Sequence, residues 1–214
     1  SAPLTPVDRP RVTPEFGAAL VVKQIGSQFR MDLRAVLKTF PFYVILLFGM
    51  VNVLVGFFGT ISQFFGTPVL PVNRMMLSIA SGNYVFIVFA IIVYYAGELV
   101  HRERQTGVAE ITDATPFPNG VMVAAKIAAL WSIVTLLLLV VMSTSMAVQA
   151  GHGYFRFEPL RYVVGLFIVE GWQLYLLSVL AVCIQTVVRN KFVGMLAFMA
   201  LFFGIGAMNS LGFE

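Results

Sequence analysis

Long uncharged stretches alternate with short charged segments along most of the chain. Residues 39–73, 75–97, 127–155, 171–188 and 192–213 contain no Asp, Glu, Lys or Arg. A helix needs about 20 apolar residues to cross the hydrocarbon core of a bilayer. Lipid offers no partner to backbone amides, so a crossing segment is either a helix or part of a closed barrel. The stretches lack the alternating pattern of barrel strands and are too long for them, so the pattern predicts helices.

We therefore predict an all-α, polytopic membrane protein with five transmembrane helices. The transmembrane domain occupies residues 39–214, and its predicted spans are 40–59, 76–99, 127–149, 161–188 and 192–210.

The N-terminal region is predicted to hold a linker followed by an amphipathic helix. Residues 1–13 are polar and proline-rich, which is typical of a linker. In residues 14–38, apolar side chains recur at steps of three and four with cations between them. This pattern favours a helix lying in the headgroup plane with its cations against anionic lipid. The alternative is a solvated helix packed on a soluble neighbour.

Composition and charge agree with a membrane location. Hydrophobic residues make up 59% of the 214-residue chain and charged residues 11%, whereas soluble domains carry about a quarter charged residues. The net charge is +4, but the cations lie beside the apolar stretches. We therefore expect the lipid bilayer, and no nucleic acid, as a partner.

The distribution of Lys and Arg predicts a cytoplasmic N-terminus. With that orientation only Arg74, Arg156 and Arg161 lie outside. The other eleven face the cytoplasm: Arg9, Arg11, Lys23, Arg30, Arg34, Lys38, Arg102, Arg104, Lys126, Arg189 and Lys191. Such an excess is the positive-inside pattern.

The polar segment 100–126 between the second and third spans is unusual in its order of residues. Glu98 precedes Arg102 by four positions, the favoured order for a helical ion pair, so the second span is predicted to continue as a helix into the cytoplasm. A short helix is predicted over 108–114, and Pro116 ends it. A short helix held between two long ones can transmit force from a cytoplasmic partner. A solvated loop that satisfies its own charges fits the pattern equally well.

Three sequence strings point to a known family. The string 97–126 begins G-E-x-x-x-R-E-R and contains D-A-T-P-x-P-N before a Lys-led span, while F-G-M-V-N-V occurs at 48–53 and Y-Y-A-G-E-L at 94–99. Together they resemble the permease subunits of type-2 ABC transporters. The resemblance is closest to a bacterial subgroup whose permease is fused to a zinc aminopeptidase-like domain.

The resemblance implies a chain that is not itself an enzyme. A separate nucleotide-binding ATPase subunit would bind ATP and Mg²⁺. A second permease half or a second copy of this chain would complete the transport pathway. The protein would be located in the bacterial inner membrane. It also implies a sixth span beyond Glu214. The residues expected to contact the ATPase subunit are Arg102, Glu103, Arg104, Glu110, Asp113, Thr115 and Pro116. This chain has no G-x-x-x-x-G-K-[ST] loop and no H-E-x-x-H motif, so no cofactor or metal ligand is predicted in it.

One acidic residue, Glu170, lies well inside a predicted span, away from its ends. A charge in lipid is costly, so Glu170 is expected to face other helices or water. It could belong to a substrate pathway, or it could have a structural role and pair near the interface close to Arg161. Two other functions stay open from the sequence, a membrane anchor for an attached domain and an intramembrane hydrolase. The hydrolase is the weaker, because the only other acid in the predicted spans, Glu98, lies at the end of the second span.

Overall fold

The computed structural model describes residues 18–63, 73–105 and 119–210, and the residues in these ranges form helices joined by short turns. In chain order the elements are α1 (Ala18–Leu37), α2 (Phe40–Gln63), α3 (Asn73–Gln105), α5 (Asn119–Gly151), α6 (Pro159–Tyr162), the π-helical η1 (Val163–Glu170), α7 (Gly171–Val187) and α8 (Lys191–Ser210). The all-α prediction is therefore confirmed. The predicted linker 1–13 lies outside the described residues.

Among the described residues, five helical stretches are long and apolar enough to cross a membrane, so the chain is an integral membrane protein. They cover Phe40–Gly59, Tyr84–Arg102, Gly120–Gly151, Pro159–Val187 and Lys191–Met208. Each overlaps a predicted span, and the α6–η1–α7 run forms the fourth of them.

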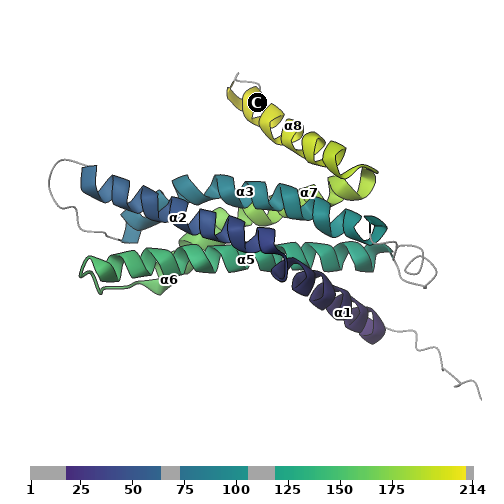
Figure 1. Ribbon diagram of the computed structural model, residues 1–214, viewed down its shortest axis with the longest axis horizontal. Helices are drawn as coiled ribbons and strands as arrows, with labels where there is room; N and C mark the ends of the chain where they lie inside the picture. The colour runs from purple at the N-terminus through teal and green to yellow at the C-terminus, as the bar shows by residue number, and fades with distance from the viewer. Residues whose placement is uncertain (1–17, 64–72, 106–118, 211–214) are drawn as a thin grey trace, which may run out of the picture.

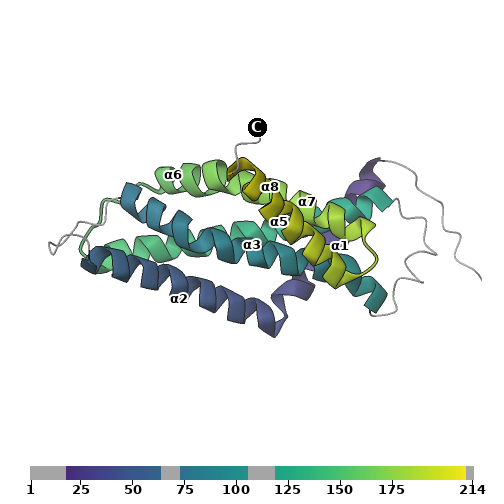
Figure 2. The same ribbon diagram turned by 90° about the horizontal axis from the view of Figure 1, so that it is seen from above.

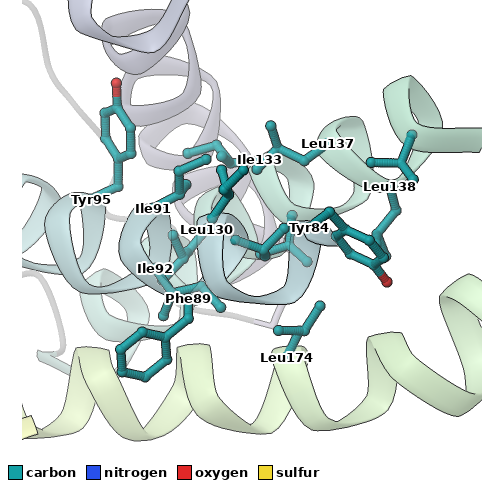
Figure 3. Close-up of a cluster of buried hydrophobic side chains, with 14 of the residues drawn as sticks. Tyr84, Phe89, Ile91, Ile92, Tyr95, Leu130, Ile133, Leu137, Leu138 and Leu174 are labelled. Carbon is teal, nitrogen blue, oxygen red and sulfur yellow. The ribbon is translucent and has the colours of Figure 1, made fainter. Parts of the chain in front are cut away.

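Helix α3 is the centre of the bundle. In the most apolar stretch of α3, 67% of the residues are buried, compared with 17% in α2 and 11% in α8. Ile91 and Ile92 of α3 pack with Leu130 and Ile133 of α5, and Leu174 of α7 lies on the other side of α3 (Figure 3). Helices α2, α3 and α5 run along the long axis of the molecule, whereas α1 and α8 leave it at an angle (Figures 1 and 2). The outer surfaces of α2 and α8 are exposed and apolar, as expected of helices that face lipid.

Helices extend from both sides into the polar segment 100–126. Helix α3 continues to Gln105, and α5 begins at Asn119. The predicted continuation of the second span as a helix is therefore confirmed. Helix α5 starts at Asn119, eight residues before the predicted third span 127–149. Hydropathy marks only the apolar part of a helix and not its polar first turns.

The fourth span contains a π-helical segment that the sequence did not predict. Residues Val163–Glu170 have π-helical geometry between α6 and α7. At Gly171, where regular α-helix resumes, a Cβ atom would lie 2.9 Å from the carbonyl oxygen of Leu166. Any larger residue would therefore have to displace the backbone. Such segments are rare and are frequently found at functional sites.

Candidate functional site: the end of helix α3 and an intramembrane carboxylate

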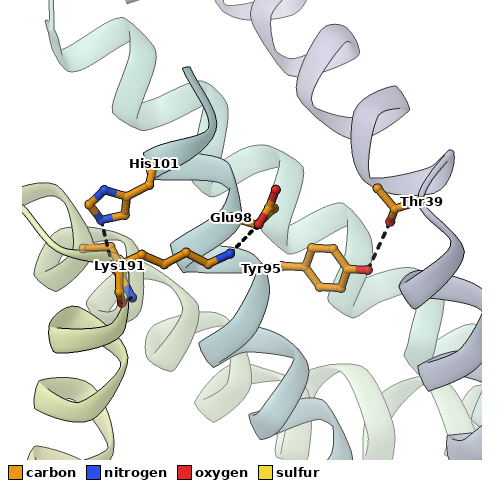
Figure 4. A network of polar contacts seen from close by, with 6 residues as sticks. Thr39, Tyr95, Glu98, His101 and Lys191 are labelled. Carbon is orange, nitrogen blue, oxygen red and sulfur yellow. Dashed lines mark hydrogen bonds and ion pairs between the residues drawn. The ribbon is translucent and has the colours of Figure 1, made fainter. Parts of the chain in front are cut away.

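The end of α3 is joined to the turn between α7 and α8 by an ion pair. Lys191, the first residue of α8, donates to Glu98 of α3 at 2.5 Å between Nζ and Oε2 (Figure 4). The side chains are 27% exposed for Glu98 and 14% for Lys191, so water screens this pair less than a surface pair. The Lys191 ammonium also lies 5.0 Å from the centroid of the Tyr94 ring, a cation–π geometry.

Gln185 of α7 reinforces the same junction. Its side-chain oxygen accepts a hydrogen bond from Nε2 of His101 at 3.1 Å, and its amide nitrogen donates to the carbonyl of Lys191 at 3.3 Å. Gln185 and His101 are both buried. Glu98, His101, Gln185 and Lys191 therefore connect α3, α7 and α8, and we call these four residues the α3 clamp. The role of Gln185 could not be predicted from the sequence, because a single glutamine among apolar residues does not indicate which residues it will contact.

Two glycines allow the helices of the α3 clamp to approach. A Cβ atom at Gly194 would collide with the side-chain oxygen of Gln185, and one at Gly97 would lie 2.7 Å from the terminal carbon of Met195. The buried amide of Gln185 occupies the space that both glycines leave. A larger residue at Gly194 would displace this amide from its two hydrogen-bond partners.

The opposite side of α3 contacts the junction between α1 and α2. Thr39 donates to the carbonyl of Val36 at 2.6 Å, so the hydroxyl of Tyr95 donates to Thr39 at 3.3 Å (Figure 4). Tyr95 lies one helical turn before Leu99 and close to Glu98 in the chain. The last turns of α3 are thus bonded to α1–α2 on one side and to α7–α8 on the other.

Helix α1 packs on the amino-terminal part of α5. Asp32 and Lys126 form an ion pair at 3.9 Å, each with a side chain only 6% exposed. Val36 of α1 is buried in the core, whereas Val22 and Met31 are exposed. The helix therefore rests on the bundle itself along one side and keeps an exposed side of cations and apolar residues. The location of this helix in the headgroup plane stays a prediction.

The residues predicted to contact an ATPase subunit fall into three groups. Arg102 lies in α3 and lines a hollow beside α1. Glu103 and Arg104 lie in the last turn of α3. The remaining four, Glu110, Asp113, Thr115 and Pro116, lie outside the described residues. The contact with such a subunit stays a prediction.

Glu170 faces a hollow inside the membrane-spanning part. This hollow has a volume of about 490 Å³, and its lining includes Ser81 of α3 and Phe202 of α8. Glu170 is half-buried, at the end of η1. Arg161, the cation at the exposed start of the same span, pairs with Glu158 and not with Glu170. Within the described residues, Glu170 has no ion pair.

A second, apolar hollow adjoins the first. It lies between α7 and α8, has a volume of about 680 Å³ and shares Phe202 and Phe203 with the hollow at Glu170. Helix α8 leaves the turn after α7 at an angle, as Figure 1 shows, and this hollow lies between the two helices. The two hollows form one groove with a carboxylate at one end and leucine and phenylalanine side chains along the rest. We call it the α7–α8 groove.

Replacing Glu170 by glutamine is expected to leave thermal stability unchanged or to raise it. The substitution removes a charge that costs about 2–3 kcal/mol in lipid, and no cation among the described residues would lose its partner. The measurement is the midpoint of thermal unfolding of the purified protein in detergent. Glu158→Gln, at the exposed start of the same span, is the matched control with a shift near zero. A drop of several degrees for Glu170→Gln alone would mean that the carboxylate holds a structural partner.

No protein-family model, no curated protein sequence and no solved structure matches this chain.

Proposed function

We propose that this chain is a permease component of an ATP-driven transporter of the type-2 ABC class. The observation that supports the proposal best is the continuity of α3. This helix begins at Asn73, passes through the centre of the bundle and continues to Gln105, where it leads into the segment with the D-A-T-P-x-P-N string. A displacement of that segment would act directly on the most buried helix of the protein.

The α3 clamp gives such a displacement a route to the α7–α8 groove. Glu98 and His101 lie in the last turns of α3, and their partners Lys191 and Gln185 lie where α7 ends and α8 begins. A shift of the end of α3 would therefore reorient α8, whose outer half forms one wall of the groove that contains Glu170. In this proposal, the groove is the part of the pathway that this chain supplies.

The proposed transporter also requires partner subunits. ATP and Mg²⁺ would bind a separate nucleotide-binding subunit, and a second permease half or a second copy of this chain would face the groove. The N-terminus would be in the cytoplasm of a bacterium, with the chain in the inner membrane. The ion pairs Asp32–Lys126 and Glu98–Lys191 support this orientation, because they bring the cation-rich α1, the end of α3 and the α7–α8 turn to the same end of the bundle.

Cysteine crosslinking tests the predicted contact with the ATPase subunit. Single cysteines at Glu103, Arg104, Glu110 and Asp113 are placed in a Cys183→Ser background, because Cys183 is an exposed free thiol. A short bifunctional reagent is expected to join these positions to a co-purified nucleotide-binding subunit, and to do so less when ATP is added.

A cysteine at Arg156 serves as the control, because it is exposed in the turn at the opposite end of α5. No crosslinked product from any of the four positions, with expression and membrane insertion intact, would reject the proposal.

A further inference from the structure

A cationic hollow of about 720 Å³ lies along α1, where it meets the end of α3. Its lining residues are Lys23, Gly26, Ser27, Arg30, Met31, Arg34, Ala35, Lys38 and Arg102. Five of the nine are cations, and no carboxylate is among these described lining residues. We call this feature the α1 hollow.

The α1 hollow follows from the spacing of residues on α1. Lys23, Arg30, Arg34 and Lys38 lie on one side of the helix because they follow one another at steps of seven, four and four. Small residues at Gly26, Ser27 and Ala35 leave space between them, and nothing lies within 4 Å of a Cβ atom at Gly26. Arg102 closes the hollow from α3.

The nearest acid on α1 is turned to the other side of the helix. Asp32 is buried against Lys126 of α5 and accepts from Gln28 at 3.4 Å. The cations of the α1 hollow thus converge from two helices. Their mutual repulsion favours an anion between them.

The position of the α1 hollow indicates what kind of anion fits. Lys38 lies two residues before Phe40, where the first span begins, so the hollow opens at the level of the lipid headgroups. Met31 lines it and is 55% exposed, and Val22 beside Lys23 is 67% exposed. Apolar and cationic side chains side by side match a molecule with a phosphate head and an acyl tail.

We propose that the α1 hollow is a binding site for the phosphate headgroup of an anionic phospholipid. Arg102 makes the site more than a generic basic surface, because the same headgroup would be bound by α1 and by the end of α3. Arg102 follows His101, a member of the α3 clamp, so a bound lipid would restrain the segment that leads out of α3. This inference does not depend on transport or on an ATPase partner.

Binding is measured with the purified full-length chain in a nonionic detergent, using short-chain phosphatidylglycerol as the probe and short-chain phosphatidylcholine as the uncharged comparison. Phosphatidylglycerol is expected to bind with at least tenfold higher affinity. Each cation near a headgroup strengthens binding about fivefold, so the double variant Arg30→Gln/Arg34→Gln should weaken it roughly thirtyfold. Arg102→Gln alone should weaken it about fivefold.

Two variants distinguish binding in a defined site from diffuse attraction to the positive surface of the protein. Arg189→Gln removes an exposed cation of the α7–α8 turn outside the α1 hollow and should change affinity less than twofold. Gly26→Trp keeps every charge but fills the hollow, and it should abolish the preference for phosphatidylglycerol. Equal weakening by Arg189→Gln and Arg102→Gln, or full binding by a folded Gly26→Trp protein, would overturn the proposal.

Two competitors identify the source of the anion. Inorganic phosphate at millimolar concentration should not displace the lipid, because it lacks the apolar tail that Met31 and Val22 would contact. An acidic peptide should compete no better than phosphate. If either displaces phosphatidylglycerol at a concentration equal to that of the lipid, the hollow binds a free anion or an acidic protein segment, and the lipid assignment is wrong.

Discussion

Replacing Lys126 by methionine is expected to lower the midpoint of thermal unfolding in detergent by roughly 10 °C, the largest effect of any single substitution considered for this chain. Lys126 and Asp32 form an ion pair at 3.9 Å with both side chains almost fully buried. Methionine has a similar length, so the change leaves little cavity and removes chiefly the charge. The carboxylate of Asp32 would then be buried without its cation, which costs about 3–5 kcal/mol.

The double variant Asp32→Asn/Lys126→Met distinguishes a charge effect from a packing effect. With both charges removed, most of the lost stability should return, because no isolated charge stays buried. Lys23→Met, an exposed cation on α1, is the matched control and should shift the midpoint by less than about 1 °C. If the double variant is as unstable as Lys126→Met, packing of the lysine chain dominates and the pair does not anchor α1.

The spans could be predicted from the sequence because their signal is local. A run of about 20 residues without charge has few structural alternatives in a membrane. The amphipathic pattern likewise predicted the helix that the structure describes as Ala18–Leu37. Each of these features is set by residues that are neighbours in the chain.

The contacts of the candidate site could not be predicted, because they join distant residues. The spacing of Glu98 and Arg102 suggested a pair within one helix, whereas Glu98 bonds Lys191, 93 residues away. Asp32 and Lys126 gave no sign of each other, since each lies in a segment with many charges. The π-helical stretch Val163–Glu170 was missed for another reason. Its residues before Glu170 are apolar on all sides, so a change of helical pitch leaves no trace in the hydrophobic pattern.

Reversing the charges of the α3 clamp tests whether α3 and α8 act as one unit. Glu98→Lys and Lys191→Glu each place two like charges side by side in a partly buried site. Each is expected to lower the midpoint of thermal unfolding by roughly 5 °C. The double variant Glu98→Lys/Lys191→Glu restores opposite charges and should recover most of this loss, although not the cation–π contact with Tyr94. Arg189→Glu reverses an exposed charge in the same turn and should change the midpoint by less than about 1 °C.

The proposed function adds ATP hydrolysis as a second measurement on the same four variants. In a complex with the nucleotide-binding subunit, both single reversals should reduce ATP hydrolysis at least tenfold at a temperature where the proteins are fully folded, and the double variant should regain it. Rescue of stability without rescue of hydrolysis would show that the pair only holds the helices together. Rescue of both is expected only if motion at the end of α3 has to reach α8, because the ion pair is then the physical link between the two.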